Sequence, residues 1–134
     1  MARPVPTTDL TPLFAALADR TRLRLLNLMI GREVCVCYFV EILRQSQPKI
    51  SRHLAYLRRA GIVVARREGK WMHYKITPPS DPGAFAILDA ALSSFAADRE
   101  MQSDLTRLAK VCCRPQTFVT LQGAPVPAAV PVES

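Results

Sequence analysis

A mainly α-helical domain that carries one small β-hairpin is the fold class predicted by this sequence of 134 residues. Apolar residues recur at helical spacing in residues 10–60 and again in residues 82–111. Between these parts, residues 62–76 alternate between apolar and polar side chains around a Glu68-Gly69 turn, which is typical of two short paired strands. The chain is long enough to bury a core without disulfide bonds, so we expect one domain.

The two ends of the chain differ in composition from this domain. Residues 1–9 are rich in proline and threonine, and we expect a flexible N-terminal arm. Residues 114–134 contain four prolines and have no hydrophobic periodicity, which predicts a Pro-rich disordered tail. The folded domain is therefore expected to cover residues 10–113.

Four short helices are expected in the first part of the domain. Asp19 and Ser46 are natural N-caps for the second and fourth helices, and Pro48 is tolerated because it lies in a first turn. Gly31 and Gly61 can supply the left-handed backbone that ends the same two helices. The expected helices are residues 10–18, 20–30, 35–45 and 47–60.

The hairpin strands are expected at residues 62–67 and 70–76, and two helical segments follow them. Ser80 or Asp81 can cap a long helix that has Pro82 near its start. The apolar stripe of this helix consists of Phe85, Leu88, Leu92 and Phe95, and the second segment covers residues 99–111.

The order of these elements is helix, helix, helix-turn-helix, hairpin and helix, which is the order of a winged helix-turn-helix domain. Residues 36–44 and 47–60 form the helix-turn-helix pair. In such a domain the second helix of the pair enters the DNA major groove, and the hairpin, called the wing, lies along the backbone or an adjacent minor groove. The element order therefore predicts a DNA-binding module.

The formal net charge of +7 is concentrated in one part of the chain. Nine of the 18 Lys and Arg residues lie in residues 44–75, together with a single acidic residue, Glu68. A local basic block on an otherwise balanced protein is typical of a face that binds a polyanion. The charge distribution thus favours double-stranded DNA as the partner.

The side chains expected to contact DNA lie in the helix-turn-helix and in the wing. Gln and Arg suit bidentate contacts to base edges, whereas Lys and Ser suit phosphates. The expected DNA-binding residues are Gln45, Ser46, Gln47, Lys49, Ser51, Arg52, His53, Tyr56, Arg59, Arg66, Arg67 and Lys70.

Four stretches, "LADRTRLRLLNLM", "CVCYFVEIL", "QSQPKISRHLAYLRRAGIV" and "RREGKWMHYKI", resemble the corresponding segments of ArsR-type (ArsR/SmtB) metalloregulatory repressors. The resemblance covers residues 10–77. It implies a homodimer that associates through its N- and C-terminal helices, binds a palindromic operator and leaves it when a toxic ion binds. The implied function is repression of arsenical resistance, with trivalent arsenic (arsenite or an organoarsenical) or antimony as the inducer.

The arsenic-sensing branch of this family carries a Cys-x-Cys-x-x-Cys run before the recognition helix. Cys35 and Cys37 match its first two positions, whereas Val40 occupies the third. Within a helix two such thiols would point about 200° apart. If Cys35 is the N-cap and Cys37 the second helical residue, the thiols can converge. The helix dipole and the nearby Arg32 then favour the thiolate, which soft ions prefer as a ligand.

Two thiolates leave a trivalent arsenic one bond short, and the other cysteines are Cys112 and Cys113. We expect one of these two to be the third metal ligand, from the same subunit or from its dimer partner. Two alternatives stay open at this point. Cys112 and Cys113 could form a second dithiol site, or the site could select methylated or aryl arsenicals, which need only two sulfurs.

Other sensing functions would use the same residues. A thiol-based redox sensor would employ the same cysteines and the same DNA-binding head, and cadmium or lead could also bind thiolates. Relatives that sense zinc use His and carboxylates on the C-terminal helix. Here the histidines are His53 and His73, and we expect them to be packing residues or, for His53, a phosphate contact.

The sequence does not favour an enzyme or a membrane protein. It has no Gly-rich phosphate loop, no paired carboxylates in a plausible cleft and no Ser/His/Asp set, so we expect neither catalysis nor an organic cofactor. It has no signal peptide and no long apolar run, so we expect a cytoplasmic protein without a membrane partner. Cysteines stay reduced in that compartment.

Overall fold

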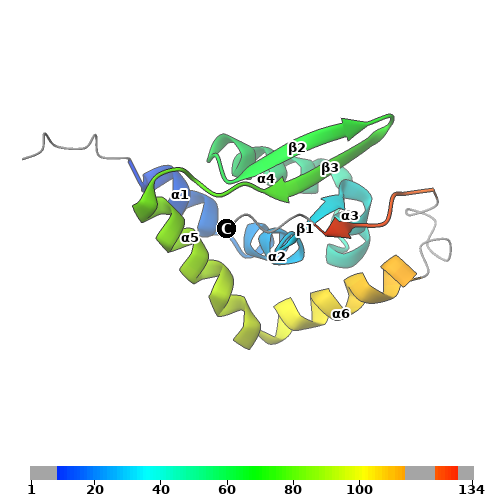
Figure 1. Cartoon of the computed structure of the whole chain (residues 1–134). Helices are drawn as coiled ribbons and strands as arrows, with labels where there is room; N and C mark the ends of the chain where they lie inside the picture. The colour runs from blue at the N-terminus through cyan, green and yellow to red at the C-terminus, as the bar shows by residue number, and fades with distance from the viewer. Residues whose placement is uncertain (1–8, 114–122, 130–134) are drawn as a thin grey trace, which may run out of the picture.

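The computed structural model describes residues 9–113 and 123–129, and Figure 1 shows their arrangement. Helices α1, α2, α3 and α4 and a small antiparallel sheet form the main body. The elements are α1 (Thr11–Leu17), α2 (Arg20–Leu28), β1 (Arg32–Cys35), α3 (Val36–Leu43), α4 (Gln47–Arg59), β2 (Val63–Glu68), β3 (Trp71–Ile76), α5 (Pro82–Ser94), the 3-10 helix η1 (Phe95–Ala97), α6 (Arg99–Cys113) and β4 (Ala128–Ala129). The predicted winged helix-turn-helix class is confirmed.

The predicted helix caps are present. The carboxylate of Asp19 accepts a hydrogen bond from the amide of Arg22 at 3.0 Å, and the Asp81 carboxylate accepts one from the amide of Ala84 at 2.9 Å. The hydroxyl of Ser46 accepts from the amide of Lys49 at 3.4 Å. Each cap satisfies a backbone N–H that has no partner inside its helix, which is why these helices begin where the sequence indicates.

The wing contains more strands than the sequence predicted. Strands β2 and β3 form the expected hairpin, but Glu68 pairs with Trp71, so the turn residues are Gly69 and Lys70 rather than Glu68 and Gly69. Strand β1, which the sequence did not predict, pairs antiparallel with β3 and places Cys35 opposite His73. Four residues are too few for a reliable alternation signal, and the strand forms because its partner β3 lies alongside it.

The predicted disordered tail does not hold for residues 123–129. Ala128–Ala129 form strand β4, which pairs antiparallel with β1 and extends the sheet to the order β2-β3-β1-β4. Ala124 is buried, and Gly123 lies beside the Trp71 ring. Residues 114–122 and 130–134 of the tail, and residues 1–8 of the predicted N-terminal arm, lie outside the described residues.

One continuous apolar core joins the helix-turn-helix to the inner face of the sheet. Leu25, Phe39, Ile50 and Leu54 are fully buried in it. Ile30, the last residue of the predicted second helix, is 37% exposed, and α2 already ends at Leu28. None of the helices in the described ranges is long and apolar enough to cross a membrane.

Helices α1 and α5 each expose one large apolar side chain, whereas most large apolar side chains of the protein are buried in the core. Phe14 on α1 is 53% exposed and Phe85 on α5 is 47% exposed. Figure 1 shows these two helices side by side at one end of the molecule, and residues of both, Leu13 and Ala84 among them, line one shared hollow. This end of the protein therefore presents an apolar surface.

Candidate nucleic-acid interface and thiol site

Helix α4 presents the predicted DNA-binding side chains on its solvent side. Ile50, Leu54 and Leu57 hold its inner face in the core. The basic residues near its end, Arg58 and Arg59, also complement the negative end of the helix dipole. Ser46, Gln47, Lys49, Arg52 and Arg59 are exposed, whereas Gln45, Ser51, His53 and Tyr56 are half-buried.

A basic hollow lies between α4 and α2. It is lined by Arg22, Lys49, Arg52, His53, Ala55, Tyr56 and Arg59. Four of the lining side chains carry a guanidinium or an ammonium group, so the hollow is suited to a phosphate of the DNA backbone. The hollow brings together five of the predicted DNA-binding residues.

Arg22 was not predicted from the sequence, yet it organises this hollow. Its guanidinium lies 4.1 Å from the centre of the Tyr56 ring and donates to the carbonyls of Ala15 and Ala16 at 2.9 and 2.8 Å. Its Nη1 atom is 3.4 Å from Nδ1 of His53. The cation thus fixes Tyr56 and His53 against α2. Nothing in the local pattern around Arg22 distinguishes it from the other arginines of α2.

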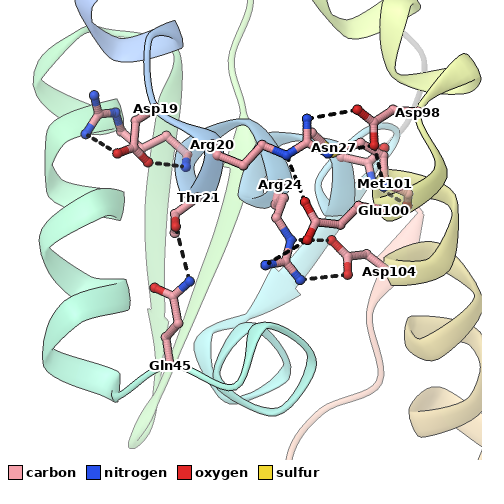
Figure 2. A network of polar contacts seen from close by, with 11 residues as sticks. Asp19, Arg20, Thr21, Arg24, Asn27, Gln45, Asp98, Glu100, Met101 and Asp104 are labelled. Atoms are coloured by element: carbon pink, nitrogen blue, oxygen red, sulfur yellow. Dashed lines mark hydrogen bonds and ion pairs between the residues drawn. The ribbon is translucent and has the colours of Figure 1, made fainter.

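His53 and Gln45 are held by contacts within the protein. Burial lowers the pKa of His53, whose Nδ1 is 3.8 Å from the carboxylate of Asp19. The side-chain amide of Gln45 donates to the hydroxyl of Thr21 at 3.1 Å, which ties the turn of the helix-turn-helix to α2, as Figure 2 shows. Both residues therefore help to set the angle of α4.

The basic residues of the wing are in two different situations. Arg67 and Lys70 are exposed, and the Lys70 ammonium lies 5.0 Å from the centre of the Trp71 ring. Arg66 instead binds the carboxylate of Glu33 on strand β1, with its Nε 3.2 Å from both carboxylate oxygens. The ion pair lowers the pKa of Glu33. One of the three predicted wing contacts is therefore already paired with a carboxylate of the neighbouring strand β1.

Cys35 and Cys37 occupy the positions that the sequence predicted. Cys35 is the last residue of β1 and the N-cap of α3, with an extended backbone, and Cys37 is the second residue of the helix. The change from strand to helix turns both thiols to the same side. The Sγ of Cys37 donates to the Sγ of Cys35 across 3.3 Å.

The surroundings of this thiol pair favour one thiolate. The hydrogen bond from the Cys37 thiol lowers the pKa of Cys35 to about 6, and the backbone amides of Cys37 and Val36 and the nearby His73 act in the same direction. The same hydrogen bond raises the pKa of Cys37, which keeps its proton. A thiolate at neutral pH is the form that binds soft ions. The expected contribution of Arg32 is not seen, and this residue lines a different hollow.

That second hollow contains Cys112 of α6. It lies between α6, the start of β1 and the tail, and its lining residues are Gly31, Arg32, Leu105, Leu108, Ala109, Cys112 and Pro127. Cys112 is half-buried. Cys113 is the last residue of α6, and its side chain lies outside the described part of the structure.

Tyr38 directly follows Cys37 on α3. Tyr38 is fully buried, and its hydroxyl has no hydrogen-bond partner among the described residues. Burial raises the pKa of Tyr38 to about 12, and the sulfurs of Cys112, Cys37 and Cys35 act in the same direction. Helix α6, which carries Cys112, packs against α3, which carries Cys37 and Tyr38. No three metal-binding side chains among the described residues are already gathered into a closed site.

A polar network attaches α6, which carries Cys112, to α2, and Figure 2 shows its contacts. Arg24 donates to both oxygens of Asp104 at 2.8 and 2.9 Å. Arg20 donates to Asp98 at 2.8 and 2.7 Å and to Glu100 at 2.8 Å. The side-chain amide of Asn27 donates to the carbonyl of Met101 at 2.9 Å. Helix α2 thus contacts α6 on one side and α4 on the other.

The comparisons with known proteins agree with this architecture. The family model described as "Bacterial regulatory protein, arsR family" matches residues 19–64, which include α2, the helix-turn-helix and the start of the wing. The chain is 44% identical over 114 residues to the arsenic resistance transcriptional regulator ArsR1 of Pseudomonas putida, a match that covers 82% of this chain and 87% of the relative. It is 43% identical over 103 residues to the arsenical resistance operon repressor of Escherichia coli, covering 75% and 86%.

Solved structures show the same fold. HlyU from Vibrio cholerae is 28% identical with a TM-score of 0.55, over 63% of this chain and 89% of that structure. The antimony-specific transcriptional repressor AntR is 29% identical with a TM-score of 0.53, over 70% of this chain and 86% of that structure. The relatives are transcriptional regulators and not enzymes. The chain therefore belongs to the ArsR family of bacterial regulatory proteins and is a DNA-binding transcriptional repressor.

Proposed function

We propose that this repressor leaves its operator when trivalent arsenic or antimony binds Cys35, Cys37 and a third thiolate from Cys112. The observation that carries the proposal is the convergence of the first two thiols at the junction of β1 and α3, with 3.3 Å between their sulfurs. Metal–thiolate bonds are about 2.3 Å long in zinc sites, so two sulfurs 3.3 Å apart can both bind one ion of similar bond length. The pair is thus spaced for capture of one soft ion.

The third ligand is proposed to come from α6 of the same subunit. Helix α6, which carries Cys112, packs against α3, which carries Cys37. Val40, at the place of the third cysteine in related arsenic sensors, offers no donor atom. Cys113 is the alternative third ligand, and an organoarsenical, with only two bonds left for sulfur, would need neither.

The repressor is proposed to act as a homodimer on a palindromic operator. Phe14 on α1 and Phe85 on α5 are exposed apolar side chains, which a second copy of the chain can cover. Each α4 then enters a major groove, with the basic hollow on a phosphate and Arg67 and Lys70 of the wing near the backbone. We place this activity in the cytoplasm, where the thiols stay reduced.

The proposed release step depends on the third thiolate. Because Cys35 and Cys37 already converge, binding to these two moves little. Recruitment of Cys112 draws α6 toward the strand–helix junction and changes the position of α3, which packs against α4. Coupling of about 1–3 kcal/mol, typical of linked binding sites, weakens operator binding about 5–150-fold.

Operator release tests the proposal directly. Fluorescence anisotropy with labelled operator DNA should show release of the wild-type protein by arsenite. The C35S/C37S double variant should bind DNA normally and no longer respond, and C112S should respond weakly to arsenite but normally to phenylarsine oxide. C113S is the matched control and should behave like wild type. Arsenite-driven release of the C35S/C37S variant would refute the site assignment.

A thiol-based redox sensor is the second candidate, because the Cys35 thiolate lies next to a second thiol. In that case diamide would release the DNA, and arsenite under reducing conditions would not. Release of the DNA by cadmium or lead would instead assign the site to divalent soft ions.

A further inference from the structure

We propose that Glu33 positions Arg66 of the wing and thereby couples the thiol site to the wing as well as to the recognition helix. This inference rests on the proposed function, since it concerns how occupation of the thiol site changes DNA binding. It is carried by strand β1, which contains Glu33 and ends at Cys35. The thiol site is thus built on the same sheet as the wing.

The register of the sheet places Cys35 of the thiol site and Arg66 of the wing in one row across the strands. Cys35 of β1 is opposite His73 of β3, and His73 is opposite Arg66 of β2. Side chains that are paired across strands point to the same face of a sheet. Glu33 is two residues before Cys35 and therefore shares this face. Val34, on the opposite face, is fully buried in the core.

The polar contacts on this face all converge on Arg66 and His73. Arg66 binds Glu33 with both Nε and Nη2, and its Nη1 is 3.8 Å from Glu68. The Nε2 atom of His73 is 3.1 Å from Glu68, and its Nδ1 atom is 4.0 Å from Glu33. His73 is buried between these groups. The polar contacts therefore run from Glu33, on the strand that ends at Cys35, to His73 and Arg66 of the wing.

The two acidic partners of Arg66 differ in where they come from. Glu68 lies on β2, in the same hairpin as Arg66, so its contact is local to the wing. Glu33 lies on β1, so its contact with Arg66 spans the sheet past β3. Loss of the Glu33 contact therefore disconnects the wing arginine from the sensor strand, whereas loss of the Glu68 contact does not.

Arg66 is suited to change partners. Its side chain is 52% exposed, whereas that of Glu33 is only 17% exposed. The Glu33 carboxylate holds the Arg66 guanidinium at a defined place on the wing. A phosphate of the DNA can bind the same guanidinium there. When the third thiolate binds the ion, Cys35 moves. Because Cys35 is the last residue of β1, Glu33 on the same strand shifts with it. The wing arginine then loses its place at the DNA backbone.

The test compares two variants that remove the same charge from the same sheet face. E33Q removes the contact between β1 and the wing, and E68Q is the matched control within the hairpin. For each protein the operator Kd is measured by anisotropy with and without sodium arsenite, and arsenite binding is measured separately by the thiolate–arsenic ultraviolet absorbance. The quantity of interest is the ratio of the two Kd values.

We expect E33Q to bind arsenite like wild type and to bind operator DNA more weakly, because Arg66 has lost its anchor. Its Kd ratio should fall by about threefold or more, a sizeable part of a typical coupling. E68Q should keep the wild-type ratio, and E33D, which restores the carboxylate, should recover most of it. R66K keeps the charge but loses the bidentate contact, so it should also reduce the ratio. The E33Q/R66K double variant should show no additional loss, because both changes break one contact.

Three results would contradict the proposal in distinguishable ways. A wild-type protein that binds arsenite but keeps its operator overturns the proposed function and this inference with it. Normal release of E33Q and R66K alongside normal wild-type release overturns this inference alone. Equal loss in E33Q and E68Q assigns the effect to the charge of the wing rather than to the contact with the sensor strand. If E33Q proves unfolded by circular dichroism, R66K and E33D carry the comparison.

Discussion

Two ion-pair networks flank the thiol-bearing segment, and they differ chiefly in burial. Between α2 and α6, the Arg24 side chain is 15% exposed and that of Asp104 is 3% exposed. In the wing, Arg66 is 52% exposed and Glu33 is 17% exposed. A buried pair loses a great deal when one partner is removed, because the other charge stays desolvated, whereas an exposed pair can exchange its partner for water or a phosphate. The first network therefore belongs to the frame of the molecule, and the second is available for regulation.

The largest expected effect comes from breaking the buried pair. D104A leaves the guanidinium of Arg24 without its bidentate partner, and we expect the free energy of unfolding to fall by about 3–5 kcal/mol. Urea denaturation followed by circular dichroism measures this loss. E100Q, at the exposed edge of the same network, is the control and should lose less than about 1 kcal/mol. Equal losses in the two variants would contradict the contrast between buried and exposed pairs.

A second change addresses the thiol pair that lies between the networks. Removing the donor in C37A should raise the pKa of Cys35 from about 6 toward the ordinary thiol value, since the hydrogen bond from Cys37 is the main cause of the lowering. The thiolate absorbance at about 240 nm, followed against pH, measures this shift. C112S is the control and should leave the midpoint unchanged. A wild-type midpoint near the ordinary thiol value, about 8.5, would contradict the thiolate assignment.

Asn27 provides a neutral member of the buried network. N27A removes the buried side-chain amide that donates to the carbonyl of Met101, so this contact between α2 and α6 loses its hydrogen bond. We expect a loss of about 1–3 kcal/mol in the free energy of unfolding, measured by urea denaturation. This value should fall between those of D104A and E100Q. A loss as large as that of D104A would mean that packing, rather than charge, dominates the contact of α2 with α6.

The exposed pair of the wing should matter little for stability. E33Q should lower the free energy of unfolding by about 1 kcal/mol or less, because Arg66 can replace the lost carboxylate by water. The same urea titration measures it. A loss of several kcal/mol would show that Glu33 supports the fold itself, and its proposed role in coupling would then need the R66K variant for proof.

The smallest effect concerns acid pH and the exposed pair of Arg20 with Asp98. The hydrogen bonds from Arg20 lower the pKa of Asp98 to about 2, below the unfolded value of 3.8. The stability from this pair is therefore fully present above the unfolded pKa and is lost as the pH falls toward 2. The D98N variant should show a weaker dependence of stability on pH within this window. An unchanged slope in D98N would contradict the contribution of this carboxylate.

The positions of the helices and of the thiol pair could be predicted because they depend on neighbouring residues. Asp19, Ser46 and Asp81 each cap a helix by a bond to an amide three residues away. The convergence of Cys35 and Cys37 follows from the same local logic, because an N-cap residue has an extended backbone and the next residues are helical.

Other features of the site depend on contacts between distant parts of the chain. Strand β1 exists through its pairing with β3, and Arg66, predicted as a free DNA contact, reaches Glu33 across 33 residues of sequence. Arg22 was overlooked because its role is to hold Tyr56, which belongs to another helix. The predicted tail contributes strand β4, whose two alanines give no signal before β1 is in place.

By itself, the sequence determined the caps, the helical and alternating periods, the basic block and the placement of two cysteines at one helix start. Only the tertiary structure decided which charges pair, with Arg24 meeting Asp104 from 80 residues away, and that α6, which carries Cys112, packs against α3. The physical reason is that capping and periodicity are set within one turn of chain. Ion pairs, strand pairing and ligand sets depend instead on which surfaces the core brings together.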